Sequence, residues 1–413
     1  MNIRSITYFL NPGYPVNEHL FQQAKAFVNE APTAFEAVGY PVQSMRMATP
    51  PFCTILPSDT HTVDDAVAFA KSVEQAAGSI GIAYTAIGPA LPDIPASYGM
   101  IPAILAETDS IFASGMMGTR ERGISLPAIR ACAQIMHDIA PIDPNGFTNL
   151  FFNASADVTG NGSFFPSAYM NTAQRVPGFA LAMEAAELAV TAFTQAATLA
   201  EATGNLTSAV NQHAQRLTSI GEELHKQFGL SFCGIDFTLA PFPALEQSLG
   251  TAFERLGVPA VGQHGSLAAA SFIMDALDRA TFQRTGFNGL MTPVLEDSTL
   301  ALRASEGTLS IKDLLMYSAV CGTGLDTVPL PGDTTPAQLA AVLLDVASLS
   351  RRLGKPLTAR LMPIPGKQAG EMTTFDFPFF ANTRVLAIDA EPLTGLFAGD
   401  EEFEIVTRPI PNE

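Results

Sequence analysis

The amino-acid sequence predicts an α/β protein in which parallel strands alternate with helices. Short apolar segments alternate with segments of helical periodicity from residue 3 to residue 139, and this rhythm is typical of βαβ units. Hydrophobic residues make up 47% of the 413 residues and charged residues only 15%. Such a composition suits a globular chain with a large buried core, as in an α/β barrel or a tight oligomer.

In the first third, each expected helix has an apolar face and each expected strand is a short apolar run. Residues 62–77 illustrate the helical pattern, because Val63, Ala66, Val67, Ala70, Val73 and Ala77 share one face. The expected strands are Ile3–Leu10, Val42–Ala48, Ile80–Ile87 and Ser110–Met117, and the expected helices are Val16–Val38, Thr62–Ala77, Tyr98–Ala106 and Ser125–Ile139.

The middle of the chain is expected to hold two long helices, Phe179–Glu201 and Leu206–Phe228, separated by Gly204-Asn205. A strand is expected before them at Phe147–Asn153. A strand at Leu230–Asp236 and a helix at Ala244–Leu256 are expected after them.

The last third repeats the alternation and has the clearest helix ends. Ser310 with Asp313, and Thr335 with Gln338, have the spacing of capping boxes. The second of these helices is expected to stop at Gly354. The remaining elements are a helix at Ser266–Arg279, strands at Gly289–Leu295 and Leu357–Leu361, a helix at Ser298–Ala304, and a turn at Val328–Gly332 between Asp326 and Asp333.

Net charge, cysteine content and terminal sequence limit the classes of partner and the location that we expect. The net charge of −18 disfavours nucleic acids and anionic membranes. The four cysteines are far apart without a CxxC pair, so a zinc knuckle or disulfide scaffold is not expected. The N-terminus lacks the pattern of a signal peptide and no apolar run is long enough to span a bilayer, so the cytoplasm is the expected location.

One block of sequence, Gly286–Asp333, resembles a known family. The matching residues are Gly289-Leu290-Met291, Pro293 to Asp297, Leu300-Ala301, Arg303, Glu306-Gly307, Tyr317 to Asp326 and Pro329 to Asp333, with Gly234 to Pro241 and Lys355 to Leu361 outside the block. They resemble the domain of unknown function seven hundred and eleven, also called uncharacterised protein family two hundred and ten. The resemblance is dense from about residue 230 to 380 and looser in the N-terminal half.

The resemblance implies a fold similar to pyruvate formate-lyase, in which two half-barrels of parallel strands surround a central finger loop. It implies one barrel domain over residues 1–395, with a βαβ start at 1–50, the long helical pair at 178–228 as part of it, and an acidic tail at 396–413. Cys321 is the candidate for the cysteine at the finger tip. The chain departs from radical enzymes at Arg384-Val385-Leu386-Ala387, where the radical glycine is missing. The resemblance also implies a homodimer.

Four residues are candidate catalytic groups: Cys321, Asp326, Asp236 and Glu296. Asp236 ends one expected strand and Glu296 follows another, and α/β enzymes place their sites at such strand ends. Three of the four have a structural alternative. Cys321 suits a buried structural thiol, Asp326 an Asx-type turn cap, and Glu296 a stabiliser of a helix N-terminus.

Four more residues are candidate substrate-binding groups: Arg303, Arg360, His264 and Asp297. Either arginine would suit a carboxylate or phosphate. The alternatives are a surface ion pair of Arg303 with Glu306, a first-turn acid for Asp297 and an exposed loop for His264.

The leading hypothesis is therefore an enzyme that acts on a small polar metabolite inside the barrel by acid–base or lyase-type chemistry. A divalent cation is left open, and no metal motif is found. The second hypothesis is a non-catalytic protein that binds a small molecule in the same pocket. A radical enzyme activated in trans is the third and has the least support.

Overall fold

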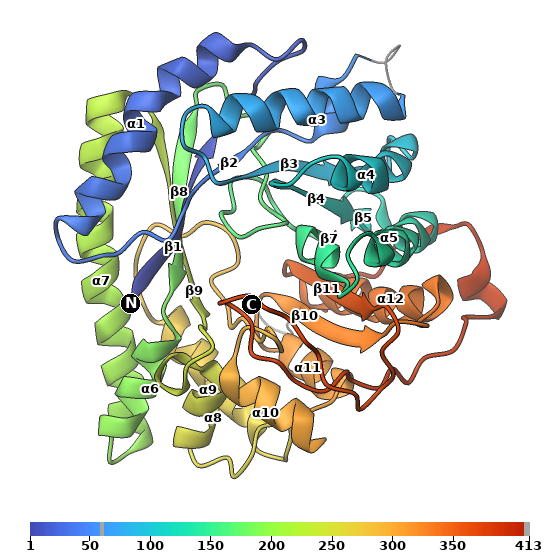
Figure 1. The fold of residues 1–413 in the computed structure, drawn as a ribbon. Helices are drawn as coiled ribbons and strands as arrows, with labels where there is room; N and C mark the ends of the chain where they lie inside the picture. The colour runs from blue at the N-terminus through green and yellow to red at the C-terminus, as the bar shows by residue number, and fades with distance from the viewer. Residues whose placement is uncertain (58–61, 409–413) are drawn as a thin grey trace.

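The computed structural model describes residues 1–57 and 62–408. It confirms the α/β class, because its main feature is a mostly parallel sheet of nine strands in the order β10-β11-β7-β4-β3-β2-β1-β8-β9 (Figure 1). These strands are β1 (Asn2–Phe9), β2 (Met45–Ala48), β3 (Tyr84–Ala90), β4 (Ile111–Met116), β7 (Phe152–Ala156), β8 (Gly178–Glu184), β9 (Ser231–Ala240), β10 (Gly324–Pro331) and β11 (Leu357–Ile364).

The sheet consists of two parallel sets of strands that run in opposite directions. In the first set, β1, β2, β3, β4 and β7 are parallel neighbours. In the second set, β8 is parallel to β9 and β10 is parallel to β11. The sets meet at two antiparallel seams, β1 with β8 and β7 with β11.

Residues 284–293 connect the two edges of this sheet and close it into a ring. Arg284 and Leu290 form parallel bridges with β9, and Pro293 forms a parallel bridge with Asp326 of β10. The strand expected at Gly289–Leu295 is thus an irregular segment that forms isolated bridges on both sides. A closed ring leaves no long unpaired edge.

The loop 157–177, between β7 and β8, crosses the interior of the ring. Ser5 and Thr7 of β1 both donate hydrogen bonds to the carbonyl of Ser163, and Thr285 donates one to the carbonyl of Asn161. The loop also forms an inner apolar cluster with side chains of five strands: Phe9, Ala48, Ala86, Phe112 and Ala180 surround Phe165, Ala168 and Met170. Contacts with both parallel sets place this loop inside the ring.

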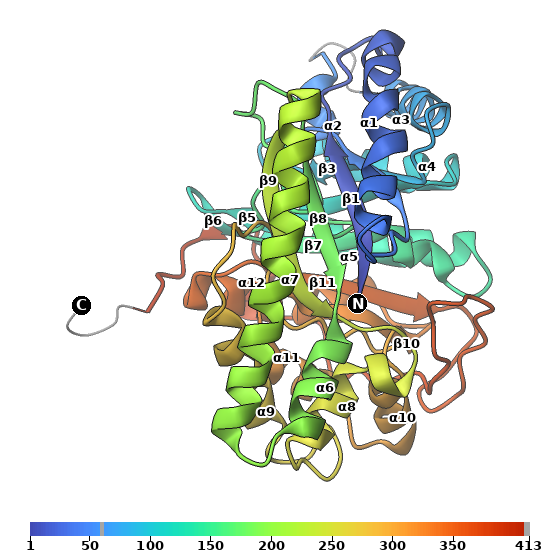
Figure 2. The same ribbon diagram turned by 90° about the vertical axis from the view of Figure 1, so that its left-hand side faces the viewer.

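The helices surround the sheet, and their apolar faces form the main core with the outward-facing strand residues. Figure 2 shows α7 along one side of the molecule, next to α1. The helices are α1 (Glu18–Glu36), α2 (Phe52–Ile55), α3 (Val63–Gly78), α4 (Ala96–Ala106), α5 (Leu126–Ile139), α6 (Ala186–Gln195), α7 (Leu199–Phe228), α8 (Leu249–Arg255), α9 (Ser266–Asp278), α10 (Ser298–Glu306), α11 (Ile311–Ser318) and α12 (Pro336–Leu353).

The prediction of a helical pair over 178–228 is wrong at residues 178–184 and in its bounds, since the first helix is α6 at 186–195. Residues 178–184 form β8, which is buried along its whole length, and a continuously apolar run does not distinguish a buried strand from a helix. The break between the helices lies before Leu199, where Thr198 caps α7, and not at Gly204-Asn205, which α7 includes.

The turn expected at Val328–Gly332 is also wrong, because residues 324–331 form β10. Pro329 and Pro331 argued against a strand, since proline cannot donate to a neighbouring strand. The strand expected at Phe147–Asn153 begins instead with a 3-10 helix, Phe147–Phe151. Both predicted capping boxes are confirmed, and α12 ends at Gly354 with φ of 66°.

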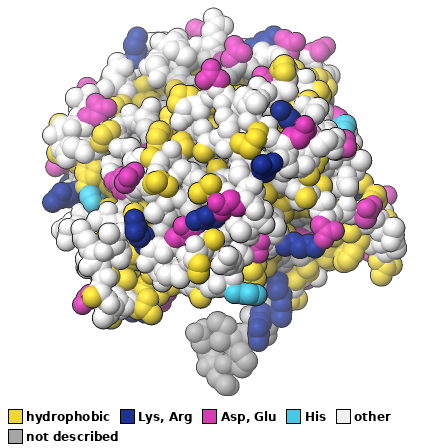
Figure 3. Space-filling view, turned by 60° about the horizontal axis from the view of Figure 1, so that its bottom comes forward, with side chains coloured by type: hydrophobic (Ala, Val, Ile, Leu, Met, Phe, Trp, Pro, Cys, Tyr) yellow, Lys and Arg dark blue, Asp and Glu magenta, His cyan; other side chains and the backbone are white. Residues whose placement is uncertain are grey.

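The last described residues lie along the surface. Glu402–Phe403 (β12) pairs with Gly123–Ser125 (β6), which pairs in turn with Gly118–Thr119 (β5). Arg122 forms an ion pair with Glu402 at 2.7 Å. On the face in Figure 3, acidic and basic side chains are interspersed with apolar ones. Within residues 1–57 and 62–408, no helix is long and apolar enough to cross a membrane.

Candidate acid–base site and ligand cavity

A cavity of about 340 Å³ opens at one rim of the ring. This rim carries the N-terminal ends of the first parallel set and the C-terminal ends of the second, because the sets run in opposite directions. The lining combines charged groups with aromatic rings: Arg4, Gln43, Ser44, Arg46, Ala83, Tyr84, Asp109, Phe112, Phe147, Leu150, Phe151, Phe164, Phe165, Met291, Glu296, Arg360, Phe377 and Phe379.

Glu296 is the buried acid of this lining, with 2% of its surface exposed. It follows the closing segment 284–293 and lies between two guanidinium groups. Arg4 of β1 forms a close ion pair with Oε2, and Nη2 of Arg360 lies 3.2 Å from Oε1. Strands from both parallel sets thus hold one carboxylate.

Arg360 connects Glu296 to a second buried acid. Its Nε donates to Oδ1 of Asp326 at 2.6 Å, and its Nη1 donates to the carbonyl of Leu150 at 3.2 Å. A guanidinium with donors on several edges can hold two carboxylates in fixed positions. Arg4 continues the network to Glu184 at the end of β8, 3.7 Å away.

The two acids that share Arg360 have pKa values displaced in opposite directions. Burial by itself would raise the pKa of Glu296, but Arg4 and Arg360 outweigh burial and hold that pKa below its ordinary value. For Asp326, burial raises the pKa, and the charge of Arg360 offsets this only in part. Glu296 is therefore ionised at neutral pH, and Asp326 has the higher affinity for a proton of the two acids.

The backbone beside Asp326 is strained. Thr327 has a φ of 40°, which is rare for a β-branched residue. The pairing of β10 with β11 shifts register at this point, between Leu325 and Val328. The resulting bulge lets Asp326 face Arg360. Such strain is often found at functional sites.

Arg46 of β2 is the third guanidinium in the cavity and differs from the other two. Its Nε donates to Oγ of Ser44 at 2.9 Å, and its guanidinium lies over the rings of Phe165, at 5.1 Å, and Tyr84, at 5.6 Å. Burial, together with the charge of Arg4, lowers the pKa of Arg46 to about 9. It remains protonated at neutral pH; the charge of Glu296 acts on it, but no carboxylate of residues 1–57 and 62–408 forms an ion pair with it.

The ring therefore brings together three of the eight candidate residues: Glu296, Asp326 and Arg360. Asp236 lies outside the cavity lining and has a structural role. Its carboxylate accepts hydrogen bonds from the backbone N–H groups of Phe287 and Asn288, so it anchors the closing segment to β9.

Asp297 and Arg303 have structural contacts outside the cavity. Asp297 accepts from the N–H groups of Thr299 and Leu300, which begin α10, and from the N–H groups of Leu249 and Gly250, which begin α8. One carboxylate thus caps two helices. Arg303 pairs with Glu254 at 2.7 Å and with Glu306 at 2.6 Å, so the ion-pair alternative is confirmed.

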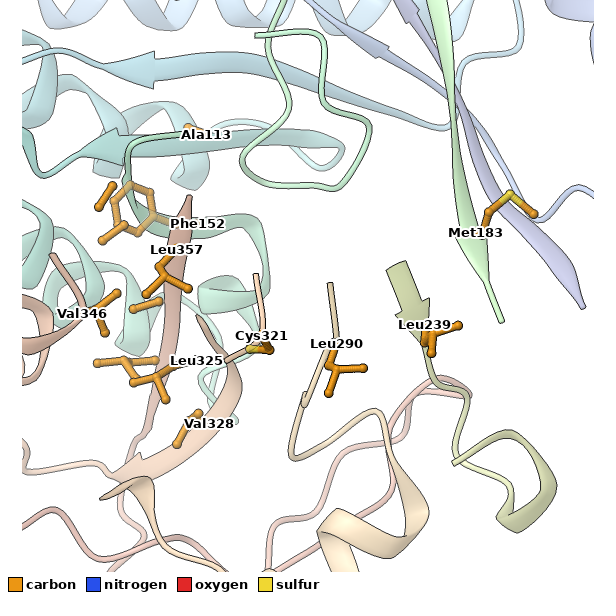
Figure 4. Packing of buried hydrophobic residues seen from close by; sticks show 14 of the residues in the cluster. Ala113, Phe152, Met183, Leu239, Leu290, Cys321, Leu325, Val328, Val346 and Leu357 are labelled. Carbon is orange, nitrogen blue, oxygen red and sulfur yellow. The ribbon is translucent and has the colours of Figure 1, made fainter. Parts of the chain in front are cut away.

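Cys321 and His264 also lie outside the cavity lining. Cys321 is 1% exposed and packs in the main core between Leu290 and Leu325 (Figure 4). The loop inside the ring is residues 157–177, so Cys321 does not occupy the interior position expected from the resemblance. His264 is exposed in the turn before α9.

The sequence predictions missed Arg4 and Arg46 because they placed sites at the C-terminal ends of strands, and missed Glu184 because residues 179–201 were predicted to be a helix, whereas residues 178–184 form β8. Arg4 and Arg46 lie near the N-terminal ends of β1 and β2. The available signal was a charged residue inside each of two apolar strands, since a charged residue in a buried strand needs a partner or a function.

The described residues supply no ready metal site. Among residues 1–57 and 62–408, no three His, Cys, Asp or Glu side chains are grouped so that they could hold a metal ion. The divalent cation left open by the sequence therefore has no ligand set in this part of the chain.

The fold and the cavity together define an α/β protein with a closed sheet and a cavity that combines a charged network with aromatic rings. The chain belongs to the family described as Uncharacterised ACR (DUF711), whose profile matches residues 1–381. This confirms the predicted family.

Its relatives include UPF0210 proteins from three bacteria. The protein of Actinobacillus pleuropneumoniae serotype 5b is 27% identical over 387 residues, which cover 87% of this chain and 83% of the relative. The protein of Neisseria meningitidis serogroup B is 27% identical over 388 residues, with the same coverage. The protein of Ligilactobacillus salivarius is 28% identical over 378 residues, which cover 87% of this chain and 82% of the relative.

Proposed function

We propose that this chain is an enzyme that binds a small molecule in the cavity and exchanges a proton with it through Glu296. The observation that carries the proposal is the position of this carboxylate: it is buried, lines the cavity, and is fixed between Arg4 and Arg360. A proton acceptor must be held within hydrogen-bond reach of its substrate, and a carboxylate clamped from two strands meets this requirement.

Arg360 and Asp326 are positioning residues in this proposal. Asp326 is absent from the cavity lining and acts through Arg360. Its Oδ1 accepts a hydrogen bond of 2.6 Å from Nε of Arg360. Two acids whose environments move their pKa values apart are the usual arrangement for acid–base chemistry. Here the ionised acid, Glu296, faces the ligand, and the acid with the raised pKa lies behind it.

The test is deuterium exchange. A bacterial metabolite extract is incubated in D₂O with purified protein, and mass spectrometry finds compounds that are converted or that gain deuterium at carbon. We expect such a compound with the wild type and with Glu107→Gln, an exposed acid outside the cavity, and we expect its loss with Glu296→Gln. If wild type and Glu296→Gln label the same compounds equally, the role of Glu296 is wrong.

A non-catalytic binding protein is the alternative, and one observation favours it. Each oxygen of Glu296 already contacts a guanidinium, and the lowered pKa makes this carboxylate a weak base. A compound that raises the melting temperature of the wild type, with no conversion and no deuterium exchange, would support this alternative.

We further propose that the ring is related to the half-barrels of pyruvate formate-lyase, with loop 157–177 as the counterpart of the finger. The support is the topology: two parallel sets, two antiparallel seams and an interior loop. The loop has no cysteine, so the proposal does not include radical chemistry. A homodimer and a cytoplasmic location remain predictions, and light scattering of the purified protein tests the first.

A further inference from the structure

The unbalanced positive charge in the cavity is carried by Arg46. Arg4 and Arg360, the other two guanidinium groups of the lining, each form ion pairs with carboxylates. Arg46 forms no such pair with any residue in the described ranges, and its polar contact there is the hydrogen bond to Ser44. Arg46 is half-buried, a partly buried charge without an ion pair is costly, and an anionic ligand would offset that cost.

Arg46 contacts two aromatic rings and one hydroxyl group. The rings of Tyr84 and Phe165 lie against the guanidinium, and Ser44 occupies Nε. No described residue accepts a hydrogen bond from Nη1 or Nη2. The two terminal nitrogens of arginine form a planar fork that matches a carboxylate or a phosphate.

The charge of the lining distinguishes these two anions. Arg4 and Arg360 are paired with Glu296, Glu184 and Asp326, so Arg46 is the one guanidinium of the lining that forms no ion pair with a described residue, and Asp109 adds a further negative charge to the lining. A single carboxylate group matches the one charge of Arg46. A phosphate dianion would leave an excess negative charge near Glu296 and Asp109, which like-charge repulsion opposes.

The rest of the cavity wall selects an apolar body. Phe147 and Phe377 have ring centroids 5.1 Å apart, and Phe377 and Phe379 have centroids 5.3 Å apart. Together with Phe151 and Met291 they form an apolar wall of mostly aromatic side chains. A volume of about 340 Å³ is at the lower end of the usual range for small-molecule pockets.

We propose that Arg46 is the binding residue for the carboxylate of the ligand, and that the ligand is a small monocarboxylic acid with an aromatic or similarly apolar body. This inference rests on the proposed function only in that it concerns the same cavity. It assigns Arg46 to binding and specificity and leaves proton transfer to Glu296.

Calorimetric titration of the wild type with matched ligands tests the proposal. The probes are phenylacetate and naphthylacetate, their amides, acetate and phenyl phosphate. We expect the two aromatic acids to bind, with the amides and acetate weaker by about tenfold or more, because a charge-assisted hydrogen bond or the apolar contact is lost. Phenyl phosphate is expected to bind more weakly than phenylacetate.

The variants locate the effect at Arg46. In Arg46→Gln, the aromatic acids should bind only as well as their amides, while binding of the amides is unchanged. Arg46→Lys should show intermediate affinity, because charge is kept and the planar fork is lost. Arg279→Gln, a change at the exposed arginine that follows α9, should bind like the wild type. If Arg46→Gln does not fold, Arg46→Lys and the comparison of acids with amides still decide.

The proposal is overturned if neither aromatic acid binds at millimolar concentration, if amides bind as well as acids, if Arg46→Gln keeps the preference for acids, or if phenyl phosphate binds more tightly. These outcomes are separate from those of the deuterium test. Binding of the acids without any proton exchange would leave Arg46 as the carboxylate site and remove the role of Glu296. Proton exchange on a compound without a carboxylate would leave the role of Glu296 and remove that of Arg46 as the carboxylate site.

Discussion

At the scale of single residues, the site depends on Arg360, because its guanidinium contacts both Glu296 and Asp326. Glu296, Asp326 and Arg360 were predicted because acids and arginines at strand ends are the usual components of α/β sites, and the ring places them together. Asp236 and Asp297 have the same residue type and similar positions, yet they bind backbone N–H groups. Local sequence does not distinguish these roles, because the partners come from remote segments.

At this scale, Arg360→Met should strongly destabilise the protein at neutral pH. The substitution leaves Glu296 and Asp326 buried without the guanidinium that they share. We expect a loss of about 3–5 kcal/mol in the free energy of unfolding, as is typical when one partner of a buried ion pair is removed. Urea unfolding measures it, with Arg279→Met as an exposed control that should change stability little. A loss as small as in the control would contradict the burial of the network.

Asp236 should make stability depend on pH in a direction unusual for a carboxylate. Burial raises its pKa to about 6, above the value in the unfolded chain, so the folded protein binds the proton more tightly. The stabilisation from this proton is complete below the unfolded pKa and is lost as pH rises through about 6.

The measurement is urea unfolding of wild type and Asp236→Asn at several values between pH 4 and pH 7. The stability difference, wild type minus variant, should fall by about 1.4 kcal/mol per unit of pKa displacement. The subtraction removes the titration of groups that both proteins share. A difference that rises with pH would show that the hydrogen bonds from Phe287 and Asn288 outweigh burial.

Elements with strong local signals were predicted well. The capping boxes at Ser310 and Thr335 specify helix starts in a few residues. The segments at β8 and β10 were misassigned because their strand character depends on burial between neighbours. β8 is apolar on both faces, and β10 contains two prolines. Pairing with neighbouring strands of the sheet determined the strand conformation of both segments.

Asp297 should matter more to stability than an ordinary helix cap, because its carboxylate caps α10 and α8 together. Loss of one cap usually costs about 0.5–2 kcal/mol. We therefore expect Asp297→Ala to cost about twice as much as Thr335→Ala, which removes a single cap from α12. Thermal and urea unfolding compare the two variants. Equal losses would mean that α8 does not depend on Asp297.

The architecture of the whole molecule explains what sequence could not supply. The cavity is formed where the N-terminal ends of one parallel set meet the C-terminal ends of the other. Arg4 and Glu296 are 292 positions apart in the chain. Their contact exists only because the ring is closed, and ring closure depends on three isolated bridges that have no local signature.

Closure of the ring can be tested at Gly286, which lies in the closing segment. It has a φ of +71°, and a Cβ atom there would lie 2.1 Å from a carboxylate oxygen of Asp236. Gly286→Ala should therefore both strain the backbone and displace the anchor of residues 284–293. Gly229→Ala is the matched control, because Gly229 has a φ of +68° with open space around it, so it reports backbone strain alone.

We expect Gly229→Ala to cost about 1 kcal/mol and Gly286→Ala to cost clearly more in urea unfolding. Hydrogen exchange should quicken in residues 284–293 and along β9 in Gly286→Ala, and remain at wild-type rates in those regions in Gly229→Ala. Since Glu296 follows the closing segment, the affinity of the cavity for a ligand should fall as well. If both variants lose the same stability and exchange in β9 is unchanged, the anchor at Asp236 does not control closure, and the position of Glu296 must be fixed by Arg4 and Arg360 alone.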